Sequence, residues 1–239
     1  MKKITLKEWV ILKTNNYNTI MGKLENAHKY ALLTCVIGFP GAGKTTTFGH
    51  YRNAHGKEVV YICLDVSFRA KDFYVTLLRE LGVPDYGYDV PIKFVASKIT
   101  ETLREREEPV LIIIDDAGRF TAPMMEWFQL IFDSENCGLI LSGTKKFKND
   151  FDGWVKQNRL GIPELASRVD EWLVLKEPTK EEMRKVALKN GVTDPATLTK
   201  LTNECSDYRK LSKKVINLRI KQVNAGKAKQ QVEEEVVTT

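Results

Sequence analysis

The sequence predicts an α/β protein, with a parallel sheet flanked by helices and, after it, a small domain built only of helices. Three observations favour this fold class. Short apolar runs rich in β-branched residues alternate with stretches of helical periodicity up to residue 177. The first of these runs leads directly into a glycine-rich turn. After residue 178 the chain has only helical patterns, which a capping box between Thr179 and Glu182 introduces.

Length and composition are those of an ordinary globular protein. The chain has 239 residues, of which 43% are hydrophobic and 28% charged. No apolar run approaches the roughly 20 residues that span a membrane, and the basic N-terminus lacks the apolar stretch of a secretory signal. The four cysteines show no metal-binding spacing, so we expect reduced thiols. We therefore expect a cytoplasmic protein with no membrane partner.

The excess positive charge is concentrated in one segment. The net charge is +6, and residues 180–221 hold eleven Lys or Arg against five Asp or Glu, which equals the excess of the whole chain. Nucleic acid is one partner for such a basic segment. A lysine-rich helical surface exposed to solvent is the other interpretation, and composition leaves both open.

The glycine-rich turn reads Gly-Phe-Pro-Gly-Ala-Gly-Lys-Thr and fits the phosphate-binding pattern G-x-x-x-x-G-K-[ST]. A predicted strand over 32–37 precedes it and a predicted helix over 45–52 follows it, which is the context of a P-loop. Its glycines bring backbone N–H groups against phosphate oxygens, and the helix start adds its positive dipole end. Lys44 would reach the β- and γ-phosphates, and the Thr45 hydroxyl would bind Mg²⁺. The predicted ATP-binding residues are Gly38, Pro40, Gly41, Ala42, Gly43, Lys44, Thr45 and Thr46.

The other elements follow in order. Strands are predicted over 58–66, 110–116, 138–141 and, after a turn of helix, within 163–175. Helices are predicted over 73–81, 91–106, 124–132, 183–190, 195–205 and 208–223. We divide the chain into an N-terminal arm (1–31), a nucleotide-binding α/β domain (32–177), a helical lid domain (178–225) and a disordered tail (226–239). The arm would pack on the nucleotide domain or on a neighbouring subunit.

Polar residues end two of the predicted strands. Five apolar residues lead into Asp115 and Asp116, as in the acidic strand that accompanies a P-loop. Asp115 would hold Mg²⁺, and Asp116 would orient the attacking water. A helix or turn cap is the alternative for such a pair, and the P-loop upstream favours the metal site. After the strand over 138–141, Thr144 is the first choice for a side chain that senses the γ-phosphate, and Ser142 the second.

Together these features resemble the AAA+ ATPases, and within them the transposition regulators of the Mu B and TnsC kind, in the clade with ExeA-like ATPases. The resemblance covers residues 32–218. It rests on four segments: Gly-Phe-Pro-Gly-Ala-Gly-Lys-Thr, Leu-Leu-Arg-Glu-Leu-Gly-Val-Pro, Ile-Ile-Ile-Asp-Asp-Ala-Gly-Arg-Phe and Leu-Ser-Gly-Thr. The first is specific for nucleotide, and the set as a whole is typical of AAA+ proteins.

The resemblance implies further roles. Arg168 matches an arginine finger that reaches the γ-phosphate held by a neighbouring subunit, and Arg209 matches the arginine with which the lid senses nucleotide. Surface arginines are the alternative for both. Basic residues in loops after the strands track DNA in TnsC-like proteins. The loosely matching residues here are Arg69, Lys71, Lys145 and Lys146.

Two departures from the family pattern bear on function. Members usually have Glu where this chain has Asp116, which is one methylene shorter, so water would be positioned less well and hydrolysis would be slow. The Mu B protein carries additional N-terminal DNA-binding sequence, and this chain has little before Leu32. Independent DNA binding by one subunit is therefore not implied.

The sequence thus predicts an ATP-dependent, DNA-binding AAA+ ATPase. It would form a homo-oligomer, a ring or a filament, on duplex DNA and would recruit or activate a transposase. One alternative is a small P-loop kinase that phosphorylates a metabolite. Another is an ATP-binding scaffold, or a secretion-type AAA+ protein, with little hydrolysis.

Overall fold

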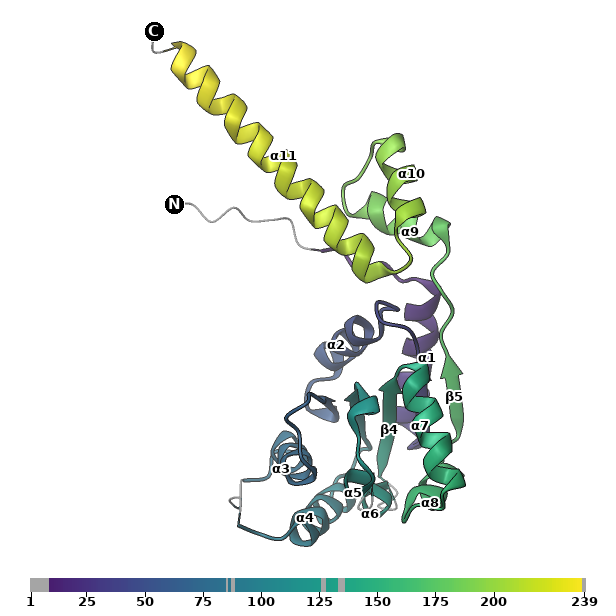
Figure 1. Cartoon of the computed structure of the whole chain (residues 1–239). Helices are drawn as coiled ribbons and strands as arrows, with labels where there is room; N and C mark the ends of the chain where they lie inside the picture. Colours follow the sequence, from purple (N-terminus) through teal and green to yellow (C-terminus); the bar gives the residue numbers. More distant parts are fainter. Residues whose placement is uncertain (1–8, 85, 87–88, 126–127, 133–135, 238–239) are drawn as a thin grey trace. The chain divides into compact units, whose positions relative to one another are not determined.

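Contacts divide the chain into two units. The computed structural model describes residues 9–84, 86, 89–125, 128–132 and 136–237. The first unit, which we call the α/β unit, comprises Asn15–Phe39 and Gly43–Lys176 (Figure 1). The second, the helical unit, comprises the described parts of Met1–Thr14, Pro40–Ala42 and Glu177–Thr239. The centre of the predicted P-loop thus groups with the C-terminal helices, although its two ends belong to the α/β unit.

The α/β unit is built on a parallel sheet. Within the described residues the sheet has five strands in the order β2-β3-β4-β1-β5, and every neighbouring pair is parallel. The strands are β1 (Leu33–Ile37), β2 (Val59–Cys63), β3 (Val110–Asp115), β4 (Cys137–Gly143) and β5 (Glu171–Val174). Every residue of β1, β3 and β4 is buried, as expected for central strands covered on both faces. The predicted parallel α/β core is therefore confirmed.

Helices cover the sheet in this unit. They are α1 (Asn15–Tyr30), α2 (Lys44–His55), α3 (Ala70–Glu80), α4 (Ile92–Arg104), α5 (Ala122–Met125), α6 (Phe128–Phe132), α7 (Lys145–Lys156) and α8 (Ile162–Ser167), with short 3₁₀ turns η1 (Gly56–Glu58) and η2 (Ala117–Arg119). Helix α7 was not predicted, because its basic residues were interpreted as a loop. Within the described part of the chain, every helix is too short or too polar to cross a lipid bilayer.

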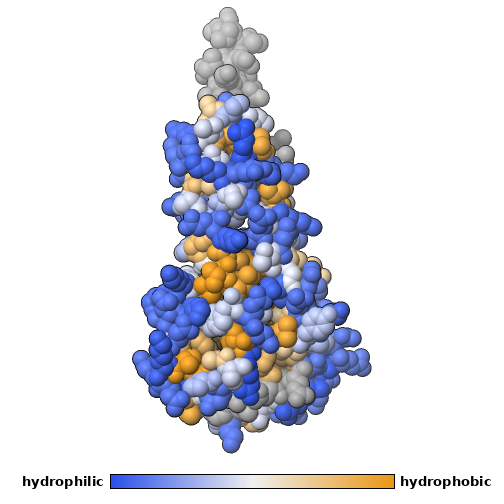
Figure 2. Space-filling view, turned by 90° about the vertical axis from the view of Figure 1, so that its right-hand side faces the viewer, coloured by the Kyte–Doolittle hydropathy of each residue, from blue (hydrophilic) through white to orange (hydrophobic). Residues whose placement is uncertain are grey.

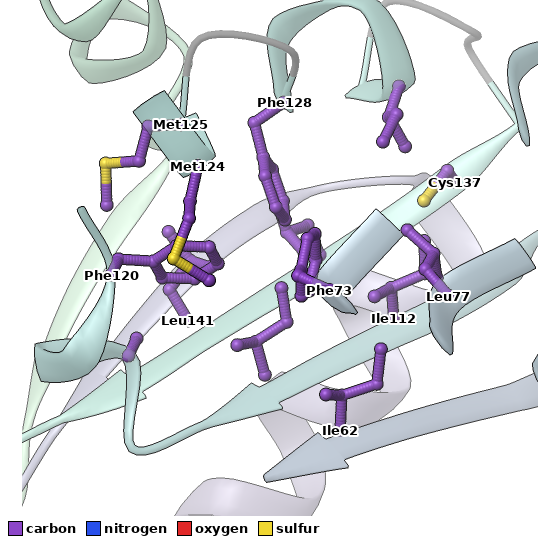
Figure 3. Packing of buried hydrophobic residues seen from close by; sticks show 14 of the residues in the cluster. Ile62, Phe73, Leu77, Ile112, Phe120, Met124, Met125, Phe128, Cys137 and Leu141 are labelled. Carbon is purple, nitrogen blue, oxygen red and sulfur yellow. The ribbon is translucent and has the colours of Figure 1, made fainter. Parts of the chain in front are cut away.

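An aromatic cluster fills the core on one face of the sheet. The ring of Phe73, from α3, stacks on Phe128 of α6 at 5.4 Å and meets Phe120 edge-on at the same distance (Figure 3). Ile62 and Ile112, on adjacent strands, lie beneath these rings (Figure 3). Offset and edge-on aromatic pairs of this kind add to the gain from buried apolar area. The core thus ties β2 and β3 to helices that follow them in the chain.

Helix α1 corrects one prediction. Residues 15–30, expected in an N-terminal arm, form a helix that belongs to the α/β unit and buries Ile20, Leu24 and Ala27. A glycine makes its close approach to β4 possible. A Cβ built on Gly138 would lie 2.1 Å from the Ala27 carbonyl oxygen, so only glycine fits here.

The helical unit is formed by α9 (Lys180–Lys189), α10 (Pro195–Glu204) and α11 (Tyr208–Val237). Trp9 and Leu12 pack against its apolar core, and the Asn190 side chain bonds both the N–H and the carbonyl of Val10. Helix α11 continues to Val237, where a disordered tail was expected from residue 226. That segment is rich in Lys, Gln and Glu, which are good helix formers, and it contains no proline.

Candidate nucleotide site

Three loops meet at one edge of the parallel sheet. Because all strands run in one direction, the carboxyl ends of β1, β3 and β4 lie at the same edge, where ligands of open α/β sheets bind. The P-loop follows β1, Asp115 ends β3, and Ser142 and Thr144 lie at the end of β4. The Gly38 N–H donates to the Gly143 carbonyl at 3.0 Å and joins the first and the third of these loops.

The part of the P-loop in the α/β unit is tightly organised. Gly43 has a φ of +95°, a conformation that favours glycine, and it caps the start of α2. Lys44 is 8% exposed, and its Nζ donates to the carbonyls of Gly38 at 2.7 Å and Phe39 at 3.3 Å. The ammonium group is thereby held against the loop that would surround a phosphate chain. Thr46 is exposed on the first turn of α2.

The centre of the P-loop contacts helix α11 inside the helical unit. The Tyr208 N–H donates to the Gly41 carbonyl at 3.2 Å. Gly41 has a φ of +88°, and a Cβ added there would lie 2.6 Å from Asp207 Oδ1. The same oxygen accepts from the Lys210 N–H at 2.8 Å and so caps the start of α11. Both backbone conformation and close packing therefore require glycine at position 41. Of its neighbours, Pro40 is exposed and Ala42 is buried.

Asp115 is a buried carboxylate with four hydrogen-bond donors around it. It is 1% exposed. Its Oδ1 accepts from Ser142 Oγ at 2.8 Å and from the Asp116 N–H at 3.0 Å. Its Oδ2 accepts from Thr45 Oγ1 at 2.6 Å and from the Tyr61 hydroxyl at 3.2 Å. These bonds offset the cost of burying a charge and fix the direction of both oxygens.

The donor set at this position fits Mg²⁺. A hydroxyl and a carboxylate are hard oxygen ligands, and Mg²⁺ is usually held by one or two such groups together with phosphates and water. Among the described residues no group of three His, Cys, Asp or Glu side chains could hold a metal ion by itself. Thr45 and Asp115 therefore fit a metal that arrives with a nucleotide.

The two strand-end hydroxyls have different surroundings. Ser142 is fully buried and bonded to Asp115, whereas Thr144 is partly exposed at the N-cap of α7. Asp116 is exposed and adopts left-handed backbone angles, φ 55° and ψ 38°, which are uncommon for a residue other than glycine. Such conformations cluster at functional sites.

Tyr61 is a site residue that the sequence interpretation did not identify. It lies in the middle of the Val-Val-Tyr-Ile-Cys strand, and only its contact with Asp115, 54 residues away, places it here. Its flanking residues Val60 and Ile62 are buried on the opposite face of β2. The signal that could have identified it is a tyrosine in an otherwise aliphatic strand, at a position whose side chain lies on the face opposite to those of Val60 and Ile62.

The two predicted arginines belong to different units. Arg168 lies between α8 and β5, before the strand begins, which is the amino edge of the sheet and the opposite side from the P-loop. Its Nη1 donates to the Glu164 carbonyl at 3.0 Å. Arg209 is exposed on the first turn of α11, in the helical unit.

The four predicted DNA-contacting residues lie at helix starts, which corrects their assignment to loops. Arg69 is the N-cap of α3, and Lys71 lies in its first turn. Lys145 and Lys146 open α7, and the Lys146 ammonium pairs with Asp150. Both pairs follow strands, so they lie at the carboxyl edge of the sheet.

Comparisons with known proteins found relatives in two phages. The chain is 23% identical over 178 residues to the ATP-dependent target DNA activator B of Escherichia phage Mu and to that of Escherichia phage D108. The match covers 74% of this chain and 54% of those relatives, so the chain spans about half their length.

Solved structures support the fold. Cdc6p from Pyrobaculum aerophilum matches with a TM-score of 0.63 at 15% identity, over 90% of this chain and 60% of that one. The Aeropyrum pernix ORC1 protein, solved in complex with DNA, matches with a TM-score of 0.62 at 15% identity, over 92% and 62%. The family model of the AAA domain matches residues 27–149, which include the P-loop, Asp115 and Ser142. The chain therefore belongs to the AAA family of P-loop ATPases, with the nucleotide-binding fold that this family shares.

Proposed function

We propose that this protein is an ATP-dependent, DNA-binding AAA+ ATPase that oligomerises on duplex DNA and recruits or activates a transposase. The observation that carries the nucleotide part of the proposal is the bond from Thr45 Oγ1 to Asp115 Oδ2, beside the ammonium-bearing P-loop. P-loop ATPases hold Mg²⁺ with this hydroxyl and this carboxylate. We also propose a cytoplasmic location, which the free thiols of all four cysteines support.

Each residue at the carboxyl edge has a role in this proposal. Lys44 neutralises the β- and γ-phosphates, and Asp115 and Thr45 hold Mg²⁺, which when bound offsets phosphate charge. Asp116 orients the attacking water, with Thr144 as the side chain that senses the γ-phosphate. Because aspartate is shorter than glutamate, we propose slow hydrolysis, which favours a long-lived ATP-bound assembly. Arg209 would contribute from the helical unit.

The position of Arg168 supports assembly from several subunits. It lies at the opposite edge of the sheet from the P-loop of its own chain, so it would act on the nucleotide of a neighbour. Exposed apolar residues offer contact area on this unit: Leu160 is 75% exposed and Val174, on the edge strand β5, is 62% exposed. Figure 2, which views the side that carries β5, shows hydrophobic residues at the surface among hydrophilic ones.

DNA binding is supported by the basic residues at the carboxyl edge. Arg69, Lys71, Lys145 and Lys146 begin helices that follow β2 and β4, and each could contact phosphates. Contacts of this kind tolerate any sequence and weaken as salt rises. The phage Mu relative is a target DNA activator, which supports the same partner. The transposase is proposed on that likeness alone.

Electron microscopy tests the proposal directly. The purified protein is imaged with duplex DNA, with and without a non-hydrolysable ATP analogue. We expect rings or filaments on DNA only with the analogue, and their loss as salt rises. Monomers under both conditions contradict the proposal. Phosphoryl transfer to small metabolites would then be screened, since a P-loop kinase is the competing function.

Two variants separate the parts of the proposal. Lys44→Ala should weaken nucleotide binding and so prevent assembly at nucleotide concentrations that are just sufficient for the wild type. The double variant Arg69→Ala/Lys145→Ala should keep nucleotide binding and lose DNA binding. Lys57→Ala, an exposed lysine in η1, is the matched control for both and should behave as wild type. Assembly that survives Lys44→Ala would contradict the ATP-dependent step.

A further inference from the structure

The carboxylate of Asp115 is oriented by donors from three neighbouring elements. Ser142 comes from β4 on one side, Tyr61 from β2 on the other, and Thr45 from the start of α2. Two donors hold Oδ1, and the other two hold Oδ2. The oxygen that faces Thr45, and so the proposed metal position, is therefore shared with Tyr61.

Strand geometry explains how Tyr61 reaches this oxygen. In the β2–β3 ladder, Tyr61 is paired with Ile113, two residues before Asp115. Residues two apart on a strand share a face, so Tyr61, Ile113 and Asp115 lie on the same side of the sheet. The long phenol side chain passes along that face and ends 3.2 Å from Asp115 Oδ2. An aliphatic side chain at position 61 would offer no donor.

The phenol is a dependable donor at this place. Burial, followed by the charge of Asp115, raises the pKa of Tyr61 far above its ordinary value. The hydroxyl therefore keeps its proton at physiological pH.

We propose that Tyr61 is a positioning residue for metal binding: its hydroxyl holds Asp115 Oδ2 beside the Thr45 hydroxyl, so that both oxygens face one Mg²⁺. The inference rests on the proposed nucleotide function and assigns it a residue outside the P-loop and the acidic strand end. Without the phenol O–H, Thr45 is the remaining donor to Oδ2 among the described contacts. Oδ1 keeps both its donors, so the strand itself stays in place.

The test compares nucleotide affinity with and without the metal. The dissociation constant of a fluorescent ADP is measured in Mg²⁺ and in EDTA for wild type, Tyr61→Phe and the control Tyr30→Phe, whose ring is exposed on α1. Partners that orient a metal ligand typically contribute 10- to 100-fold to metal affinity. We therefore expect the increase in nucleotide affinity that Mg²⁺ gives to be about tenfold smaller in Tyr61→Phe than in wild type. Its affinity in EDTA should stay near wild type, and Tyr30→Phe should change neither constant.

Each other outcome overturns the inference. If Mg²⁺ increases the nucleotide affinity of Tyr61→Phe as much as that of wild type, the phenol does not position the metal ligand, while the proposed function stands. If Tyr61→Phe loses the same nucleotide affinity in Mg²⁺ and in EDTA, Tyr61 supports the P-loop instead. A wild-type protein that binds no nucleotide in either buffer contradicts the proposed function as well. Titration of the nucleotide complexes with Mn²⁺, followed by electron paramagnetic resonance, reads the metal itself and should show the same loss.

Discussion

The two edges of the parallel sheet in the α/β unit carry different kinds of polar group. At the carboxyl edge, Lys44, Asp115 and Ser142 are all less than 9% exposed and lie at the ends of strands or in the P-loop. At the amino edge, a cavity of about 500 Å³ is lined by side chains from α1, α2, η1 and the residues before β3. Its glutamates, Glu25, Glu58 and Glu108, are exposed.

Bonded and stacked rings join several elements at the amino edge. The His28 Nε2–H donates to the Pro109 carbonyl at 3.1 Å, and His28 Nδ1 is bonded to the Tyr51 hydroxyl at 3.0 Å. The His55 ring stacks on Tyr51 at 4.0 Å and bonds its carbonyl at 2.9 Å. Burial and the charges of Glu25 and Glu58 raise the pKa of Tyr51 to about 12, so its hydroxyl stays protonated at neutral pH.

We expect the carboxyl edge to serve function and the amino edge to serve stability. At the carboxyl edge, buried charge is tolerated only because fixed donors surround it, and such sites are typical of ligand binding. At the amino edge, the bonds join α1 and α2 to the start of β3, so they stabilise the fold. We therefore expect variants at the first edge to change nucleotide affinity and variants at the second to change unfolding.

The largest effect is expected at Gly138, at the amino edge. Gly138→Ala places a Cβ 2.1 Å from the Ala27 carbonyl oxygen and 3.2 Å from Leu111 Cδ1, so α1 must move away from β4. Overpacking costs typically 1–3 kcal/mol, and a backbone clash lies at the upper end, about 3 kcal/mol. Urea unfolding measures the loss. Gly22→Ala in α1, with no atom within 4 Å, is the control and should be equally stable or gain about 0.5–1 kcal/mol.

Lys44→Ala should have the largest effect at the carboxyl edge. A hydrogen bond to a charged group contributes about 1.5–3 kcal/mol, so nucleotide affinity should fall about 10- to 100-fold. Fluorescent nucleotide titration measures this, with Lys57→Ala as control. The free energy of unfolding should change little, and a large destabilisation with unchanged affinity would reverse the assignment of the two edges.

Tyr51→Phe should have a moderate effect on stability alone. It removes the hydroxyl bonded to His28 and keeps the ring that stacks on His55. The net contribution of one such bond is about 1 kcal/mol, which should appear in urea unfolding. Nucleotide affinity should equal that of wild type. A loss of affinity in this variant would show that the two edges are coupled.

Acid sensitivity is the smallest expected effect. Burial lowers the pKa of His28, while the Pro109 bond and the charge of Glu58 act in the opposite direction and His55 lowers it further. Its unfolded pKa is about 6.5, so as pH falls below this value the unfolded state takes up the proton first and stability decreases. Unfolding midpoints from pH 7.5 downward should fall in wild type and fall less in His28→Gln. Identical slopes would exclude His28 as the group responsible.

Much of the carboxyl edge could be predicted from sequence because its signals are local. The P-loop pattern depends on residues within one turn, and the apolar run before Asp115 has the composition of a central parallel strand. Apolar runs also predicted each strand of the sheet that the structure describes. Helix α7 was missed because three lysines near its start obscured the apolar side that Phe147 and Phe151 bury.

The parallel α/β fold and a nucleotide as ligand could both be predicted from the sequence, since both predictions follow from patterns within short segments. Only the tertiary structure decided the strand order β2-β3-β4-β1-β5, the contact of Tyr61 with Asp115, and the packing of Gly41 against Asp207. Tyr61 and Asp115 are 54 residues apart, and the P-loop centre is separated from α11 by most of the chain. Such contacts depend on how buried surfaces fit together in space, and no local pattern in the sequence records that fit.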